Sequence, residues 1–160
     1  MTRVEIIDGL VNYFGIYELV DEQTYNRFGE EAWQFFDTDT LHVLLIIREG
    51  IDKPIDINNW KWGGVYDERG LRTNVCDIVS RKTRANKLYL SGHVLGKAID
   101  FKVKGMKSED VRHWIQDNED LFPCKIRLEH IKTKTGNPIS WVHYDTKHIS
   151  DKPKIYWFNV

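Results

Sequence analysis

The spacing of apolar residues changes near residue 53, and this change restricts the possible folds more than any other feature of the chain. In residues 1–50 the apolar side chains recur at helical spacing. They fall into three stretches: residues 2–14, residues 21–36 with a break at Gly29, and residues 41–50. Thr2 and Glu5 have the capping-box pattern that begins a helix. We predict helices for all three stretches, although the β-branched residues of the third also fit a strand.

Residues 54–160 carry the signals of short β-strands. Strand-like runs occur at residues 54–57, 98–103, 125–129, 139–145 and 154–158. Ser108 is placed to cap a helix between the second and third runs, and residues 133–138, T-K-T-G-N-P, supply turn chemistry for a hairpin. The 160 residues suit one compact domain. We therefore predict a single α+β domain over residues 1–160, with N-terminal helices packed on a mainly antiparallel sheet.

Residues 91–100, S-G-H-V-L-G-K-A-I-D, have the residue types of a hydrolytic metal site. Such a site needs three protein ligands, usually imidazole or carboxylate, and one open position. His93 and Asp100 supply one ligand of each kind. Gly96 is expected to let the chain turn back, and Ala98 to pack beneath the site. Ser91 is expected to hydrogen-bond a ligand.

A third ligand is available in the W-V-H sequence of residues 141–143. Strand alternation puts Trp141 and His143 on one face and Val142 on the other. A W-x-H sequence by itself is more typical of a buried core pair. Together with the segment around His93, it indicates that His143 completes the metal site.

The ordered set S-x-H-x-x-G-x-A-x-D, followed by W-x-H, resembles the zinc D-Ala-D-Ala carboxypeptidases of peptidase family M15, which also includes bacteriophage endolysins. The resemblance covers residues 54–145 and does not extend to the first fifty residues. It implies a hedgehog/DD-peptidase-like fold in which His93, Asp100 and His143 hold Zn²⁺. It also implies hydrolysis of a peptide bond in peptidoglycan, such as a D-Ala-D-Ala, L-Ala-D-Glu or cross-bridge bond.

Arg72 is the first of two further residues to which the resemblance gives a role. Gly70-Leu71-Arg72 is similar to a G-[aromatic]-R stretch of the family, with Leu71 in place of the aromatic residue. The family's arginine stabilises the oxyanion that develops during amide hydrolysis. An ordinary surface ion pair is the alternative interpretation of Arg72.

The general base is the second role that the resemblance implies. Many relatives have a glutamate three residues before the last zinc histidine, where this chain has Ser140. Others take a carboxylate from the partner strand of the hairpin, and Glu129 matches that pattern. His130 is the rival candidate, but alternation sends Glu129 and His130 to opposite faces. Asp145 is expected to support His143 or to end the strand.

The sequence is also compatible with two other functions. A zinc-stabilised binding domain of the same fold would keep the metal without catalysis, and Ser140 in place of glutamate favours that alternative. A cytoplasmic dipeptidase acting on free D-Ala-D-Ala would also need no signal peptide.

Composition and charge exclude several classes of protein. The net charge of −1 provides no basic field for nucleic acid. The longest apolar run, residues 43–47, is too short to cross a bilayer. Glu5 and Asp8 interrupt the apolar character of the N-terminus, so we expect synthesis in the cytoplasm without a signal peptide, and action on the cell wall after release.

The expected partner is a peptidoglycan peptide. The sequence leaves the oligomeric state open and favours a monomer.

Overall fold

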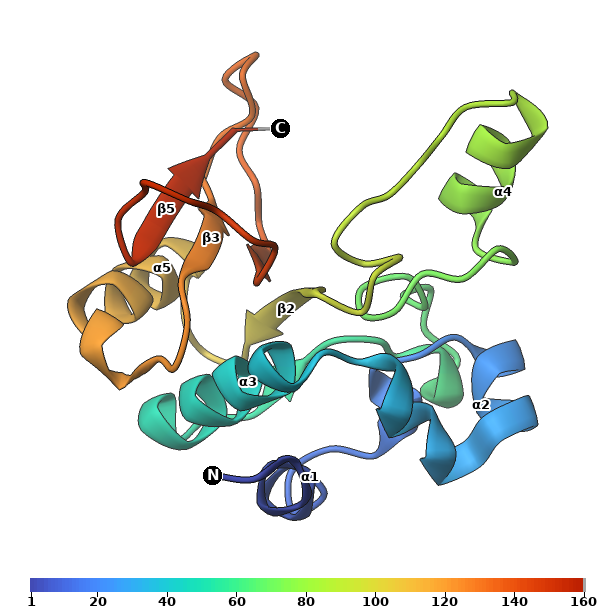
Figure 1. The fold of residues 1–160 in the computed structure, drawn as a ribbon, viewed down its shortest axis with the longest axis horizontal. Helices are drawn as coiled ribbons and strands as arrows, with labels where there is room; N and C mark the ends of the chain where they lie inside the picture. Colours follow the sequence, from blue (N-terminus) through green and yellow to red (C-terminus); the bar gives the residue numbers. More distant parts are fainter. Residues whose placement is uncertain (160) are drawn as a thin grey trace.

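The computed structural model describes residues 1–159, and over that range it contains five α-helices and five β-strands (Figure 1). The helices are α1 (Arg3–Leu10), α2 (Glu22–Phe28), α3 (Thr38–Ile51), α4 (Asp77–Arg84) and α5 (Ser108–Asp117). The strands are β1 (Ile55–Asp56), β2 (Ala98–Val103), β3 (Ile126–Glu129), β4 (Val142–Asp145) and β5 (Ile155–Phe158). Short 3₁₀ helices are η1 (Ile16–Glu18), η2 (Gly29–Phe35), η3 (Trp60–Trp62) and η4 (Glu119–Leu121). The α+β class is confirmed.

Local caps explain where the N-terminal helices begin and end. Thr2 and Glu5 form the predicted capping box, each side chain accepting a hydrogen bond from the other residue's backbone N–H. Gly29 ends α2 with a φ of 52°, which glycine adopts easily. The third stretch is a helix rather than a strand. It begins at Thr38, because the Asp37 side chain caps it.

The predicted cap of α5 was wrong. Lys107 occupies the N-cap position and Ser108 is the first helical residue. The Ser108 hydroxyl instead donates a hydrogen bond to the Ile139 carbonyl oxygen at 3.2 Å. This bond joins the helix to the segment before β4, a long-range contact that a local sequence pattern does not reveal.

The strands form one sheet in the order β1-β2-β4-β3-β5. The pairs β1–β2, β2–β4 and β3–β4 are antiparallel, and β3–β5 is parallel, so the sheet is mixed and mainly antiparallel. The predicted hairpin joins β3 to β4. Gly136 has a φ of 83° in its turn, and Lys132 bridges to Pro138.

The two faces of the sheet differ in chemistry. Alternating side chains of β2, β3 and β4 enter the apolar core on one face: Ile99, Phe101, Ile126, Leu128, Val142 and Tyr144. The intervening side chains, including Asp100, Arg127, Glu129, His143 and Asp145, lie on the other face and line a cleft. Function is therefore expected on this second face.

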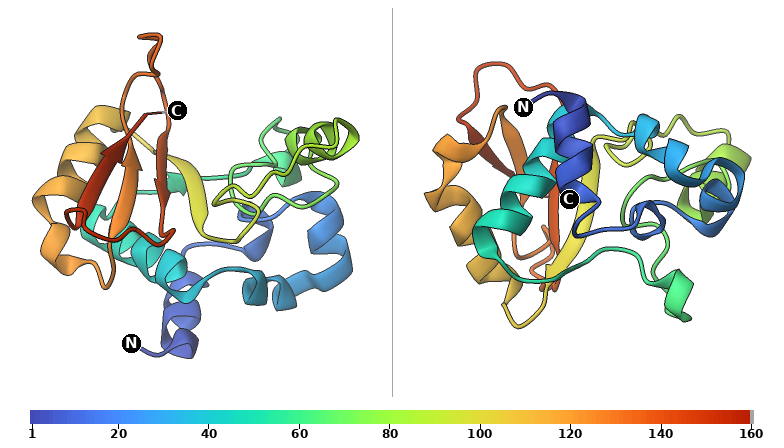
Figure 2. Two further views of the ribbon diagram at one scale, coloured as in Figure 1. Left: turned by 45° about the horizontal axis from the view of Figure 1, so that its top comes forward. Right: turned by 90° about the horizontal axis from the view of Figure 1, so that it is seen from below.

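The N-terminal helices cover the apolar face. α3 lies along the sheet and α1 packs on the far side of α3 (Figures 1 and 2). The Tyr144 hydroxyl donates to the Thr40 carbonyl oxygen at 2.8 Å, and the Thr40 and Thr146 hydroxyls are 2.6 Å apart. None of the helices within residues 1–159 has the length and apolar character needed to cross a membrane.

Residues 58–97 leave the sheet between β1 and β2 and include α4, which lies on the other side of β2 from β5 in Figure 1. The sequence predicts no helix or strand in this region. Val79 is the single buried residue that α4 contributes. The only apolar residues of α4, Ile78 and Val79, are adjacent, so no apolar residue recurs at helical spacing and the helix was missed.

Candidate metal centre

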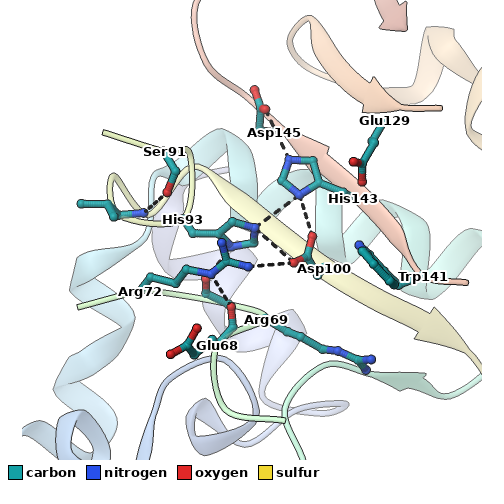
Figure 3. Close-up of polar contacts among 12 residues, drawn as sticks. Glu68, Arg69, Arg72, Ser91, His93, Asp100, Glu129, Trp141, His143 and Asp145 are labelled. Atoms are coloured by element: carbon teal, nitrogen blue, oxygen red, sulfur yellow. Dashed lines mark hydrogen bonds and ion pairs between the residues drawn. The ribbon is translucent and has the colours of Figure 1, made fainter. Parts of the chain in front are cut away.

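Strand pairing places three of the predicted site residues in one row across the open face of the sheet (Figure 3). Asp100 of β2 is paired with His143 of β4. The register that joins Leu128 to Tyr144 puts Glu129 of β3 opposite His143 on the other side. His143 therefore lies between the two carboxylates, although the three residues are far apart in the sequence.

His93 reaches this row from the turn before β2. Gly96 has a φ of 65° in that turn, and a Cβ atom there would lie 2.0 Å from the Phe35 carbonyl oxygen. Glycine is thus required both for the backbone conformation and for the close packing. The predicted turn at Gly96 is confirmed, and it brings the buried His93 side chain to Asp100.

The candidate ligand atoms are close enough together to hold a metal ion. One ligand atom each from His93, Asp100 and His143 lies within 4.8 Å of the others. His93 Nε2 is 3.3 Å from His143 Nδ1 and 3.3 Å from Asp100 Oδ2, whereas His143 Nδ1 is at the hydrogen-bond distance of 2.6 Å from Asp100 Oδ1. Zinc–ligand bonds of about 2.0–2.1 Å at tetrahedral angles separate neighbouring ligand atoms by about 3.3 Å. Two imidazoles and one carboxylate fit zinc, and also other divalent ions that accept this donor set.

The remaining ring nitrogen of each histidine is held by an acceptor. His93 Nδ1 is 2.7 Å from the Gly70 carbonyl oxygen, which leaves Nε2 directed at the site. His143 Nε2 is 3.4 Å from Asp145 Oδ2, which leaves Nδ1 directed at the site. Such contacts fix the orientation of metal-binding histidines in proteins. The expected support of His143 by Asp145 is present.

The electrostatics of the trio favour a cation between His143 and Asp100. Burial opposes the charge on His143, but its hydrogen bonds to Asp100 and Asp145 raise the pKa of His143 to about 9. Burial also opposes the charge on Asp100, yet hydrogen bonds from His143 and His93 hold the pKa of Asp100 well below its usual range. Burial lowers the pKa of His93. The metal-free site therefore holds a proton on His143 at neutral pH, at a position where a metal ion would bind.

Arg72 lies beside the site and is ion-paired within it. Its Nη2 atom is 3.2 Å from Asp100 Oδ2, and its Nε atom donates to the Glu68 carbonyl oxygen at 2.7 Å. The Arg72 backbone N–H donates to the His93 carbonyl oxygen at 3.1 Å. The two side chains are only 17% and 11% exposed, so this is not the surface ion pair of the alternative interpretation, and Arg72 also lines the cleft.

Glu129 and His130 face different clefts, as strand alternation predicted. Glu129 is buried and lines the cleft that contains His143. Burial raises the pKa of Glu129, and the nearby His143 opposes the rise. His130 stacks on Trp157 in a second cleft, with ring centroids 5.1 Å apart. Only Glu129 of the two candidate bases lines the cleft of the candidate ligands.

Two smaller expectations had different outcomes. Ser91 does not bond to a ligand, because its hydroxyl accepts a hydrogen bond from the Val94 backbone N–H at 3.3 Å and so stabilises the turn. Ala98 is fully buried beneath the site. A Cβ atom on Gly92 would lie 2.8 Å from Ala98 Cβ, so the turn packs closely only over a small residue.

The cleft, of about 280 Å³, also contains residues that the sequence reasoning missed. They are Tyr89, Arg127, Lys147 and Phe158. Arg127 lies two residues before Glu129, so strand alternation was a sufficient signal for it. Phe158 arrives through the parallel pairing of β5 with β3, and Tyr89 comes from the region in which α4 was missed. Neither had a local signal.

Comparison of the chain with family models, with curated proteins and with solved structures gave no match. Function is therefore inferred from the residues of the site.

Proposed function

We propose that this chain is a zinc-dependent peptidase that hydrolyses a peptide bond in bacterial cell-wall peptidoglycan, with His93, Asp100 and His143 as zinc ligands. The observation that carries the proposal is the convergence of these three side chains at ligand spacing in an open cleft. The substrate class comes from the resemblance to family M15, in which the same ordered motifs are found. The hedgehog/DD-peptidase-like fold is part of the same proposal.

The reaction proposed is addition of water to an amide. A bound zinc ion would polarise the scissile carbonyl and activate the attacking water. Glu129 accepts a proton from that water and delivers it to the leaving nitrogen as the C–N bond breaks. Arg72 stabilises negative charge on the former carbonyl oxygen. The products are a carboxylate and an amine, without a covalent intermediate on the protein.

Two features support Glu129 in this role. It lies next to His143 across the β3–β4 pair without being one of the three ligands. Its raised pKa brings the carboxylate closer to the operating pH, where proton transfer in both directions is efficient.

The test is a digest of purified peptidoglycan by the zinc-loaded protein, the chelated protein and the Glu129→Gln variant, with products identified by mass spectrometry. We expect new peptide termini only with the zinc-loaded wild type, and their masses identify the bond cleaved. Release of alanine from free D-Ala-D-Ala, without any attack on peptidoglycan, would instead support the dipeptidase.

A zinc-stabilised binding domain is the alternative without catalysis. It predicts that the zinc-loaded protein cosediments with peptidoglycan and leaves every wall type and every short substrate uncleaved. That result would overturn the proposed peptidase.

A further inference from the structure

Arg127 is a cation of the cleft that has no place in the proposed hydrolytic machinery. It lies on β3, on the same face as Glu129 and two residues before it. Its Nε atom is buried and lies 3.2 Å from Asp145 Oδ1, without the alignment of a hydrogen bond. The side chain is 23% exposed, so part of the guanidinium remains accessible from the cleft.

An aromatic ring directs this guanidinium toward the metal ligands. The Cζ atom of Arg127 lies 4.4 Å from the centroid of the Phe158 ring. Phe158 is paired with Glu129 rather than with Arg127, and its ring centroid is 5.7 Å from that of His143. The side chain of Arg127 therefore leans from its own position on the strand toward the row that contains Glu129 and His143.

With a divalent metal ion bound, the cleft would carry an excess of positive charge that could attract an anion. Its lining cations are Arg72, Arg127 and Lys147, and its lining carboxylates are Asp100, Glu129 and Asp145. These six charges cancel when the histidines are neutral. A divalent metal ion on the proposed ligands would therefore leave the cleft with an excess of positive charge, which attracts anionic ligands.

We propose that Arg127 binds a free carboxylate of the substrate, one or two residues from the scissile bond. This inference rests on the proposed peptidase function and deepens it. The positions of Arg127 and Glu129 are about 7 Å apart along the strand, and one extended peptide residue spans about 3.3–3.6 Å. A guanidinium is suited to carboxylate because it offers two parallel N–H donors. The carboxylate is either the C-terminus of the peptide or the free α-carboxylate of a γ-linked glutamyl residue.

Matched substrates distinguish these two sources. One pair is a peptide ending in D-Ala-D-Ala, as the free acid and as the C-terminal amide. The other pair contains an L-Ala-γ-D-Glu unit with its α-carboxylate free or amidated. We expect the wild type to prefer the free carboxylate about 10- to 100-fold in kcat/KM within one pair, the range of a hydrogen bond to a charged group.

The variants assign that preference to Arg127. Arg127→Gln should lose it mainly through KM, and Arg127→Lys should keep part of it. The control is Arg27→Gln, which removes an exposed guanidinium that lies over Phe28 outside the cleft. Equal hydrolysis of acid and amide by the wild type in both pairs, or an unchanged preference in Arg127→Gln, would overturn the inference while leaving the peptidase intact.

A binding measurement separates the inference from the proposed function. Calorimetric titration measures binding without turnover. The ligands are N-acetyl-D-alanine and whichever γ-glutamyl peptide the zinc-loaded protein does not cleave. We expect one of these carboxylates to bind about 10-fold or more tightly than its amide, and Arg127→Gln to remove the difference. If no peptide is hydrolysed, the peptidase proposal fails, and this titration alone decides the role of Arg127. Equal binding of acid and amide would then refute it.

Discussion

The Nε2 atom of His143 lies 3.4 Å from Oδ2 of Asp145. Asp145 is two residues further along β4 and on the same face of the strand. This contact directs Nδ1 of the imidazole at Asp100 and His93. Because β4 pairs with β2 on one side and with β3 on the other, the oriented ring lies between Asp100 and Glu129. A single strand thus carries a candidate ligand and the carboxylate that orients it.

Replacing Asp145 should weaken metal binding without removing a ligand. We expect Asp145→Asn to lower zinc affinity about 10- to 100-fold, the usual effect of losing an orienting carboxylate. Competition with a chromogenic chelator measures the affinity. Asp52→Asn is the matched control, because the Asp52 side chain is 91% exposed in an ion pair with Arg48. Equal affinities for the two variants would contradict the orienting role of Asp145.

Replacing Glu129 should separate binding from catalysis. We expect Glu129→Gln to keep zinc affinity within a few-fold and to lower kcat by about 10²–10⁴, the usual contribution of a general base. His130→Gln alters the neighbouring side chain, which faces the other cleft, and should retain wild-type activity. Full activity in Glu129→Gln would remove the base assignment. Full activity in that variant together with its loss in His130→Gln would transfer the role to His130.

Zinc binding should release about one proton at pH 6. The pKa of His143 is raised to about 9, so this ring is protonated in the metal-free protein and must lose its proton to bind a metal. Burial lowers the pKa of His93, so His93 contributes less to this release than His143. The apparent affinity for zinc therefore rises with pH, by about tenfold per unit below the pKa of His143.

Calorimetry at pH 6 in two buffers of different ionisation enthalpy counts this proton. This pH lies below the pKa of about 7 that is typical of zinc-bound water, whose ionisation would add to the count. Glu129→Gln should release the same number. Release of no proton would contradict the charge assigned to His143.

Gly96→Ala should damage both the fold and the site. The positive φ at Gly96 costs a non-glycine residue about 1–2 kcal/mol, and the contact with the Phe35 carbonyl oxygen adds to this cost. Gly136→Ala isolates the backbone effect. Gly136 also has a positive φ, but a Cβ atom added there would meet no other atom within 4 Å. Chemical unfolding and zinc titration should show a larger loss of stability for Gly96→Ala, and a loss of zinc affinity in that variant alone. Similar results for both variants would show that packing at Gly96 is unimportant.

The elements that the sequence predicted were those with a strong local pattern. The strand from Ala98 to Val103 alternates cleanly, and the capping box at Thr2 and Glu5 is a purely local interaction. Alternation also sufficed to place Glu129 and His130 in different clefts. The sequence did not predict α4, whose apolar surface is almost absent, or the position of Ser108, which is set by a bond to Ile139.

The candidate site was predictable to the extent that its residues form ordered motifs. His93, Asp100 and His143 converge as expected, since Gly96 turns the chain and strand pairing joins Asp100 to His143. The remainder of the cleft depends on pairing between distant segments. Phe158, for example, reaches the site through a parallel pairing that no local pattern encodes.

A crystal structure of the zinc-soaked protein, with anomalous diffraction collected at the zinc edge, would show whether the three side chains hold the metal. We expect one strong anomalous peak about 2.0–2.2 Å from His93 Nε2, His143 Nδ1 and an Asp100 carboxylate oxygen, with water as the remaining ligand. A peak elsewhere, or imidazoles turned away from it, would contradict the metal site. A fourth protein ligand in place of the water would contradict the peptidase.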